Sequence, residues 1–203
     1  RGGTYKPRTS PYDFQGLGLD GMKILDDIRR KYNLLAVSEI LDPRDIEIGV
    51  KYTDIIQIGS RNMQNYSLLK EIGKINHPIL LKRGMMATIN EFLFAAEYIA
   101  SNGNENIIMC ERGIRTFETY TRNTLDITCI AAIKKETSLP VIADLSHSLG
   151  RTDLALPIAK SVKALGVDGI MVEMCESPNK ALSDAHQHLS FKQFDELVGQ
   201  LRM

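Results

Sequence analysis

Residues 78–84 read Pro-Ile-Leu-Leu-Lys-Arg-Gly, an apolar run that stops at two cations and a glycine. A short apolar run of this kind is typical of a strand in a parallel sheet, because such a strand is buried on both faces. Residues 54–61, Asp-Ile-Ile-Gln-Ile-Gly-Ser-Arg, repeat the pattern one step earlier in the chain. The repetition predicts parallel strands whose carboxyl ends carry polar groups.

Apolar runs like these recur at regular intervals, separated by longer segments with the apolar spacing of helices. The predicted strands are residues 34–40, 54–59, 78–84, 106–113, 140–147 and 169–175. The predicted helices are residues 19–32, 44–51, 62–75, 88–101, 123–137, 152–165 and 190–201. This alternation indicates βα units and an α/β fold.

The strand ends decide between an open doubly wound sheet and a barrel. A doubly wound sheet gathers its ligands at one switch point, whereas a barrel uses the carboxyl end of nearly every strand. Every predicted strand here ends in polar residues, namely Glu39, Ser60 with Arg61, Lys82 with Arg83, Glu111 with Arg112, His147 and Glu173. We therefore predict a (β/α)₈ TIM barrel in which this chain lacks the first strand and most of the second. Residues 1–203 are expected to form a single catalytic barrel domain, incomplete at its N-terminus.

Composition narrows the classes of partner. Lys plus Arg and Asp plus Glu balance at 25 each, so no net field draws the chain to nucleic acid or to an anionic membrane. No apolar run approaches the roughly 20 residues that cross a bilayer. The three cysteines, Cys110, Cys129 and Cys175, show no CxxC spacing, which suits a reducing compartment. We expect a cytoplasmic protein without nucleic-acid or membrane partners.

Basic residues form the first candidate constellation, because a phosphate group needs several donors at once. Each cation by itself is more often a solvated surface group. Their repeated placement at predicted strand ends favours a phosphate site instead. The candidates are Arg1, Lys6, Arg8, Arg61, Lys82 and Arg112.

A second constellation consists of His147, Glu173 and Asp184, at the last two predicted strand ends and in the loop after them. One imidazole and two carboxylates suit Mn²⁺, Fe²⁺, Co²⁺ or Zn²⁺ better than Ca²⁺. The other histidines, His77, His186 and His188, are expected to be solvated, and Cys110 is expected in the core.

Several segments together resemble one enzyme family, 3-deoxy-D-arabino-heptulosonate 7-phosphate (DAHP) synthase in its compact microbial type I form. They are residues 1–16 (Arg-Gly-Gly-Thr-Tyr-Lys-Pro-Arg-Thr-Ser-Pro-Tyr-Asp-Phe-Gln-Gly), 58–63 (Ile-Gly-Ser-Arg-Asn-Met), 81–84 (Leu-Lys-Arg-Gly), 110–117 (Cys-Glu-Arg-Gly-Ile-Arg-Thr-Phe), 144–147 (Asp-Leu-Ser-His) and 182–184 (Leu-Ser-Asp). The resemblance runs through the chain in order. It implies condensation of phosphoenolpyruvate with erythrose 4-phosphate to DAHP and phosphate, the first step of the shikimate pathway.

The resemblance also implies a role for each candidate. The phosphate of phosphoenolpyruvate is expected to bind Arg61, Lys82, Arg112 and the backbone amide of Ser60. Its carboxylate and reacting centre are expected to contact Arg1 and Lys6. Glu39 is expected to lie near the bound molecule. Erythrose 4-phosphate is expected at Arg8 and Thr9. The divalent metal is expected on His147, Glu173 and Asp184. Lys6 and His147 are the expected catalytic residues, with Lys6 as a proton donor.

One departure from the family pattern keeps two alternatives open. The family's fourth metal ligand is a cysteine at the end of the first barrel strand, and none of Cys110, Cys129 and Cys175 occupies that place. The chain as given is therefore expected to be weakly active, and an inactive phosphate-binding remnant is one alternative. The other is the sister synthase that takes arabinose 5-phosphate and makes an octulosonate 8-phosphate. A homo-oligomer is expected.

Overall fold

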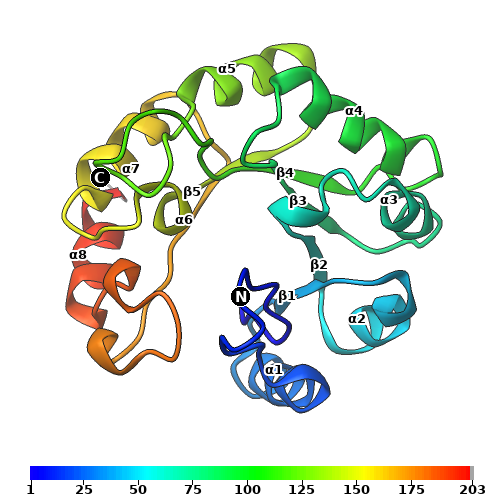
Figure 1. Ribbon diagram of the computed structural model, residues 1–203, viewed down its shortest axis with the longest axis horizontal. Coiled ribbons are helices and arrows are strands. Elements are labelled where there is room, and N and C mark those ends of the chain that lie inside the picture. The colour runs from blue at the N-terminus through cyan, green and yellow to red at the C-terminus, as the bar shows by residue number, and fades with distance from the viewer. Residues whose placement is uncertain (202–203) are drawn as a thin grey trace. The chain divides into compact units, whose positions relative to one another are not determined.

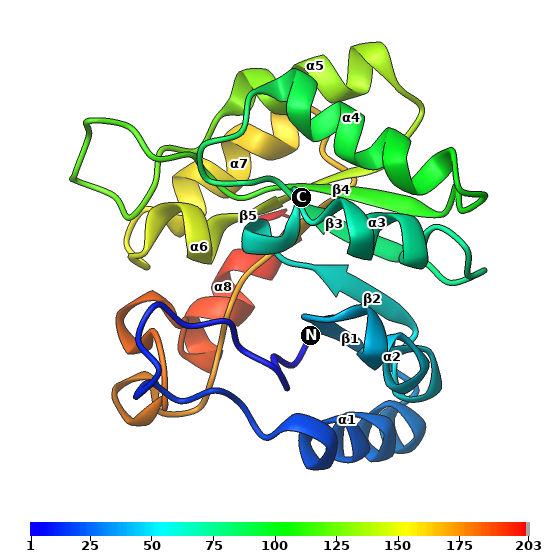
Figure 2. The ribbon, with the colours of Figure 1, turned by 45° about the vertical axis from the view of Figure 1, so that its right-hand side comes forward.

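The computed structural model describes residues 1–201, which divide into two compact units (Figures 1 and 2). The first unit comprises residues 1–84 and 90–108. The second comprises residues 85–89 and the described residues from 109 onward. The single barrel domain expected from the sequence stays a prediction.

Three parallel strands form the centre of the first unit: β1 (Val37–Ile40), β2 (Ile55–Ile58) and β3 (Ile79–Lys82). Glu39 pairs with Gln57, and Ile58 pairs with Leu81. Most residues of these strands are buried, as expected for a parallel sheet covered on both faces. The register brings the carboxyl ends of the strands level with one another.

Helices follow the strands of the first unit in the order that the spacing predicts. They are α1 (Gly18–Tyr32), α2 (Ile46–Tyr52), α3 (Tyr66–Ile72) and α4 (Ile89–Ala100), with short 3₁₀ turns η1 (Pro43–Asp45) and η2 (Ser60–Asn62). Helix α1 ends at Tyr32 and is followed by the C-cap residue Asn33, which adopts a left-handed conformation. The α1 residue Arg29 pairs with Asp26 and with Asp54, just before β2.

The second unit repeats the arrangement with β4 (Ile107–Glu111, which begins in the first unit), β5 (Val141–Asp144) and β6 (Gly169–Met171). Cys110 pairs with Ile142, which in turn pairs with Gly169, again in parallel. The helices are α5 (Ile127–Glu136), α6 (Leu145–Leu149), α7 (Ala155–Ala164) and α8 (Phe191–Leu201), with 3₁₀ turns η3 (Pro178–Lys180) and η4 (Ala185–Gln187). Helices α7 and α8 lie side by side, joined by a hydrogen bond from Lys160 to Gln200 (Figure 1).

Several boundaries differ from those that the sequence predicts. Strand β6 ends at Met171, so Glu173 lies beyond the strand and not at its end as predicted. At two other boundaries a capping aspartate gives the reason. The predicted strand 140–147 stops at Asp144, because the Asp144 carboxylate accepts the His147 amide at 3.0 Å and starts helix α6 there. The predicted helix 123–137 begins only at Ile127, capped by Asp126, because Thr124 pairs instead with Ile114 in an isolated bridge. In both cases a capping aspartate moved the boundary.

The parallel strands and alternating helices confirm the α/β class. Within residues 1–201, no helix is long and apolar enough to cross a membrane.

Candidate functional site

In the first unit, three polar side chains form a row at the strand ends. Arg1 donates from Nε to Gln57 Oε1 at 2.7 Å, and Gln57 Nε2 donates to Glu39 Oε2 at 2.9 Å. Glu39 and Gln57 are register partners on β1 and β2, so their side chains lie on the same face of the sheet. The N-terminal segment is held against β1, since Gly2 N donates to Val37 O at 3.0 Å. Two predicted site residues, Arg1 and Glu39, are thus linked through a glutamine.

Glu39 is a buried acid, and its Oε1 atom has no hydrogen-bond partner among the described residues. Burial raises the pKa of this carboxyl, and the charges of Arg1 and Lys82 oppose the rise. A buried carboxyl close to cations makes this edge of the sheet a candidate functional site.

The cations of the first unit lie at two levels of burial. Lys82, the last residue of β3, is only 3% exposed, whereas Arg61 on η2 is exposed. Arg61 Nη2 donates to Thr9 Oγ1 at 3.3 Å, which joins η2 to the N-terminal loop. Ser60 is the first residue of η2. The structure therefore brings together Arg61 and Thr9, two residues that the sequence analysis assigned to different substrates.

Backbone bonds shape the loop that carries Lys6 and Arg8. Lys6 N donates to Gln15 O at 2.9 Å, and Gly18 N donates to Thr4 O at 2.8 Å, so the two arms of the loop run beside each other. Arg8 Nε lies 3.9 Å from Asp13 Oδ2 within the same loop. Pro7 restricts Lys6 to extended backbone conformations.

In the second unit, Arg112 follows directly after β4 and is only 4% exposed. Its Nη1 donates to Gly113 O at 3.2 Å, and burial lowers the pKa of the guanidinium while Asp144 opposes that effect. The preceding Glu111 is also buried and accepts the Gly113 amide at 2.7 Å. A buried arginine at a strand end is suited to binding an anion.

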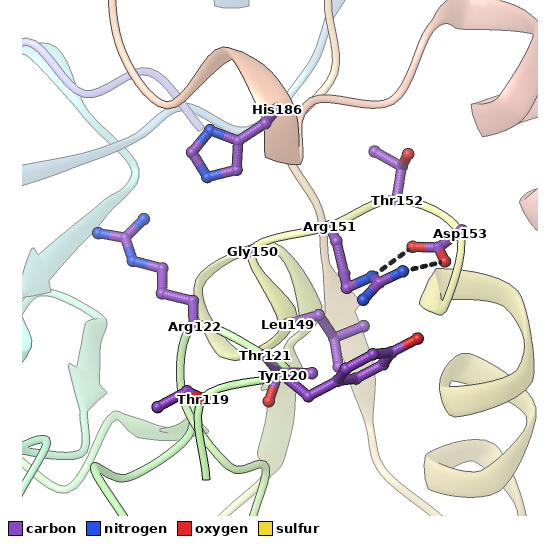
Figure 3. A pocket seen from close by; sticks show the side chains of 10 residues that line it. All are labelled: Thr119, Tyr120, Thr121, Arg122, Leu149, Gly150, Arg151, Thr152, Asp153 and His186. Atoms are coloured by element: carbon purple, nitrogen blue, oxygen red, sulfur yellow. Dashed lines mark hydrogen bonds and ion pairs between the residues drawn. The ribbon is translucent and has the colours of Figure 1, made fainter.

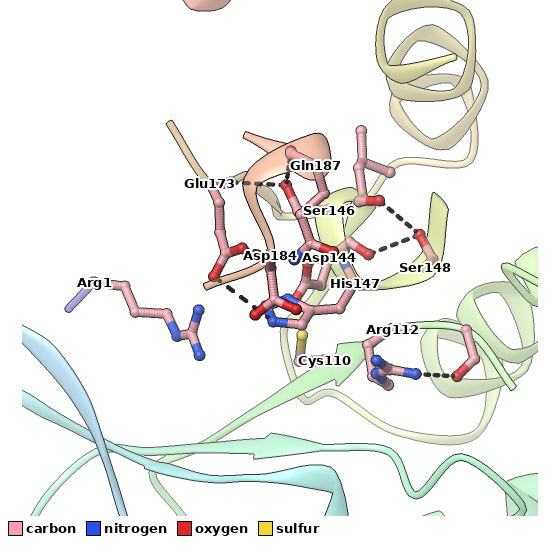
Figure 4. A network of polar contacts seen from close by, with 12 residues as sticks. Arg1, Cys110, Arg112, Asp144, Ser146, His147, Ser148, Glu173, Asp184 and Gln187 are labelled. Atoms are coloured by element: carbon pink, nitrogen blue, oxygen red, sulfur yellow. Dashed lines mark hydrogen bonds and ion pairs between the residues drawn. The ribbon is translucent and has the colours of Figure 1, made fainter. Parts of the chain in front are cut away.

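His147 forms the centre of the polar network in Figure 4. Its Nδ1 lies 2.8 Å from Asp144 Oδ2, and its Nε2 lies 3.7 Å from Glu173 Oε1. Asp144 is fully buried, so it fixes the imidazole ring and directs Nε2 toward Glu173. The sequence predicted His147 at the end of a strand, which is wrong, because His147 lies on helix α6.

Asp184 lies just before η4 in a left-handed backbone conformation, with φ at 53°. Its Oδ1 is 3.2 Å from Arg122 Nη1, and the same nitrogen donates to Gln187 Oε1 at 2.7 Å. Gln187 Nε2 in turn donates to Glu173 Oε2 at 2.6 Å. Asp184 and Glu173 are therefore linked through Arg122 and Gln187.

The sequence reasoning missed four residues of this network: Asp144, Arg122, Gln187 and His188. Asp144 could have been found from its spacing to His147, because the side chain of an aspartate N-cap accepts the backbone amide of the third helical residue. No sequence pattern indicates Arg122 or Gln187, because each makes its contacts with residues that are distant in the chain.

His188 was expected to be solvated, which is wrong: its side chain is 15% exposed and lies 4.0 Å from Glu173. His77 was also expected to be solvated, but its Nε2 is buried without a partner among the described residues, and burial lowers its pKa.

The donor set fits a divalent metal in part. A histidine oriented by a buried carboxylate, with a second carboxylate facing its other nitrogen, is the usual arrangement around a metal-binding imidazole. Among residues 1–201, however, no three His, Cys, Asp or Glu side chains are grouped closely enough to hold an ion. The three-ligand site of His147, Glu173 and Asp184 thus remains a prediction.

A cavity of about 650 Å³ opens beside this network (Figure 3). Two arginines line it. Arg122 comes from the loop after β4, and Arg151, after α6, pairs with Asp153 at 2.6 Å and stacks 4.3 Å over the Tyr120 ring. Exposed His186 lines the same cavity.

Two groups of known enzymes are similar to this chain in sequence. The chain is 54% identical over 202 residues to phospho-2-dehydro-3-deoxyheptonate aldolase of Thermotoga maritima, covering 100% of this chain and 60% of that protein. It is 30% identical over 211 residues to 2-dehydro-3-deoxyphosphooctonate aldolase 1 of Arabidopsis thaliana, covering 96% of this chain and 72% of that protein. It is 28% identical over 206 residues to 2-dehydro-3-deoxyphosphooctonate aldolase of Syntrophotalea carbinolica, covering 96% of this chain and 73% of that protein.

The structural comparison agrees. The crystal structure of phospho-2-dehydro-3-deoxyheptonate aldolase (DAHP synthase) from Thermotoga maritima matches with a TM-score of 0.94 and 52% identity, over 99% of this chain and 58% of that one. A truncated form of that organism's 3-deoxy-D-arabino-heptulosonate 7-phosphate synthase matches with a TM-score of 0.91 and 51% identity, over 99% of this chain and 73% of that one. The match confirms the predicted TIM-barrel fold class.

The chain spans about 60% of the length of the Thermotoga protein that it resembles. The family model described as the DAHP synthetase I family matches residues 1–202. The chain therefore belongs to the DAHP synthetase I family.

Proposed function

We propose that the protein condenses phosphoenolpyruvate with D-erythrose 4-phosphate to give DAHP and inorganic phosphate. The observation that carries this proposal is the near-complete burial of a cation at two strand ends, Lys82 on β3 and Arg112 after β4. Burying a cation costs free energy unless anionic groups compensate it, and a dianionic phosphate is such a group. Membership in the DAHP synthetase I family supports the same reaction.

Phosphoenolpyruvate is assigned to the most buried cations. In this proposal Lys82, Arg61 and Arg112 bind its phosphate, with the backbone amide of Ser60. Arg1 binds its carboxylate, and Glu39 lies near the bound molecule. The link from Arg1 through Gln57 to Glu39 supports this, because it holds the Arg1 guanidinium in a fixed direction at the strand ends.

Erythrose 4-phosphate is assigned to Arg8 and Thr9 in the N-terminal loop. The hydrogen bond from Arg61 to Thr9 supports this placement, because it joins the loop that would bind the acceptor to a residue assigned to phosphoenolpyruvate. The 54% identity to a heptulosonate enzyme, against 30% or less to the octulosonate enzymes compared above, favours a four-carbon over a five-carbon acceptor.

His147, Glu173 and Asp184 are proposed to bind a divalent metal, Mn²⁺, Fe²⁺, Co²⁺ or Zn²⁺. When bound, the metal supplies Lewis-acid polarisation of the acceptor's aldehyde. The Asp144 carboxylate lies 2.8 Å from His147 Nδ1, which favours a proton on that nitrogen and directs Nε2 toward Glu173. The protein is also expected to be a homo-oligomer.

Lys6 is the proposed proton donor. The bond forms between C3 of phosphoenolpyruvate and the aldehyde carbon, and the aldehyde oxygen then takes a proton from the Lys6 ammonium. Water adds at C2, and cleavage of the C2–O bond releases inorganic phosphate. Several cations are required because two phosphorylated substrates repel each other in one cavity.

The test is a steady-state assay of the protein with phosphoenolpyruvate and either erythrose 4-phosphate or arabinose 5-phosphate, following phosphoenolpyruvate loss and phosphate release. We expect a clear preference for erythrose 4-phosphate in kcat/KM. Equal specificity constants, or preference for arabinose 5-phosphate, would assign the protein to the octulosonate reaction instead. Absence of turnover with both sugars would support the inactive phosphate-binding alternative.

A further inference from the structure

Arg122 lies at the junction of the polar network in the second unit. One atom, Nη1, contacts two acceptors: Gln187 Oε1 at 2.7 Å and Asp184 Oδ1 at 3.2 Å. Its side chain is 35% exposed and lines the cavity shown in Figure 3. Arg122 lies outside the sequence segments that resemble the family.

Gln187 carries the influence of Arg122 onward to a second carboxylate. Its side chain is 2% exposed, and its Nε2 donates to Glu173 Oε2 at 2.6 Å (Figure 4). Only one orientation of the amide satisfies both neighbours, because the guanidinium can only donate and the carboxylate accepts. Arg122 therefore fixes the orientation of Gln187, and Gln187 fixes one oxygen of Glu173.

The backbone beside Arg122 is tied to the helix that carries His147. Arg122 N donates to Leu149 O at 2.9 Å, and Asn123 Nδ2 donates to His147 O at 2.9 Å. A Cβ atom at Gly150, whose φ is 67°, would lie 2.5 Å from Arg122 Cβ, so only glycine allows this close approach. Residues 122–123 are thus hydrogen-bonded directly to His147 and Asp184, and they reach Glu173 through Gln187.

We propose that Arg122 is a positioning residue that restrains the two carboxylates assigned to the divalent metal, Asp184 directly and Glu173 through Gln187; this inference rests on the proposed metal-dependent function. Two carboxylates that share a site repel each other, and the guanidinium offsets that repulsion while it occupies one oxygen of Asp184. Arg122 itself does not bind the metal, since a cation would be repelled by it. Loss of such outer contacts lowers metal affinity by about 10- to 100-fold in known sites.

The experiment is calorimetric titration of the metal-stripped protein with MnCl₂, without substrates, so that the readout is independent of turnover. The variants are Arg122→Met and Arg122→Lys. The matched control is Arg151→Met, which removes a second arginine of the same cavity whose partners are Asp153 and Tyr120. Thermal unfolding of each variant is recorded in parallel.

We expect the Mn²⁺ dissociation constant to rise about 10- to 100-fold in Arg122→Met, to recover partly in Arg122→Lys, and to stay unchanged in Arg151→Met. Wild-type affinity in Arg122→Met overturns the inference while leaving the proposed function intact. An equal loss in Arg151→Met also overturns it, because the effect then belongs to the cavity and not to Arg122. If Arg122→Met unfolds, Gln187→Leu decides, because it cuts the same link to Glu173: weaker Mn²⁺ binding in the folded variant supports the inference, and wild-type affinity overturns it. If the wild type binds no Mn²⁺ but turns over both substrates, the metal assignment fails together with this inference.

Discussion

The carboxylate of Glu39 rests against the backbone of Gly59, so closely that a Cβ atom at Gly59 would meet Glu39 Oε1 at 2.0 Å. Gly59 has an ordinary φ of −73°, so a side chain there is excluded by space and not by backbone strain. We expect Gly59→Ala to displace Glu39 and to destabilise the fold by about 1–3 kcal/mol, as overpacking of a buried position does. Gly199→Ala on α8 is the control, because nothing lies within 4 Å of its added methyl group. Chemical denaturation should show a loss for the first variant and none for the second.

Glu39→Gln tests the buried carboxyl. Burial raises the pKa of Glu39 in the folded state, so the folded protein holds this proton more tightly than the unfolded chain does. Stability from this group is then greatest at low pH and is lost as pH rises from the ordinary value of 4.5 through the raised one. We expect the variant to gain free energy of unfolding relative to wild type as pH rises, and to match it at low pH. A difference that shrinks with rising pH contradicts this.

Arg29→Ala removes a cation shared by two carboxylates, Asp26 and Asp54, at 2.6 and 2.7 Å. The hydrogen bond from Arg29 lowers the pKa of Asp26, so its stabilisation is present above the ordinary value of 3.8 and is lost as pH falls through the lowered one. We expect a lower Tm at neutral pH, with the gap to wild type narrowing in acid. Arg44→Ala is the control, since the Arg44 side chain is 87% exposed and such pairs contribute little.

Arg8→Ala should act on the acceptor sugar phosphate. Its guanidinium is assigned to the erythrose 4-phosphate phosphate, so its loss is expected to raise the KM for that substrate by about 10-fold or more, as for a charged hydrogen bond. The KM for phosphoenolpyruvate should change much less. Steady-state kinetics with each substrate varied in turn measure both constants, and a defect confined to phosphoenolpyruvate would reverse the assignment.

Removal of the metal should abolish turnover. We expect a chelator to inactivate the protein and Mn²⁺ to restore activity. His147→Ala should prevent the recovery, because it removes the imidazole that Asp144 orients. Full turnover after chelation, verified by metal analysis, would show that His147 and Glu173 serve another purpose.

The sequence alone determined the α/β class and the identity of the candidate residues. Local patterns are sufficient for this, because buried parallel strands are mostly apolar and many of the candidate residues stand at or near their carboxyl ends. The β3 run ending in Lys82 is one example, and the run ending in Arg112 is another. The motif at 144–147 likewise identified His147, although not the helix on which it lies.

Only the tertiary structure decided which side chains meet. Arg122 and Asp184 are 62 residues apart, and Arg1 and Gln57 are 56 apart, yet each pair forms a hydrogen bond. No local pattern carries such a contact, because its geometry depends on the register of strands and on loops held by distant backbone groups. The orientation of His147 was also hidden, since it depends on where β5 gives way to α6 at the Asp144 cap. Sequence patterns reflect local conformation and burial, whereas the partners of a polar side chain depend on the packing of the whole unit.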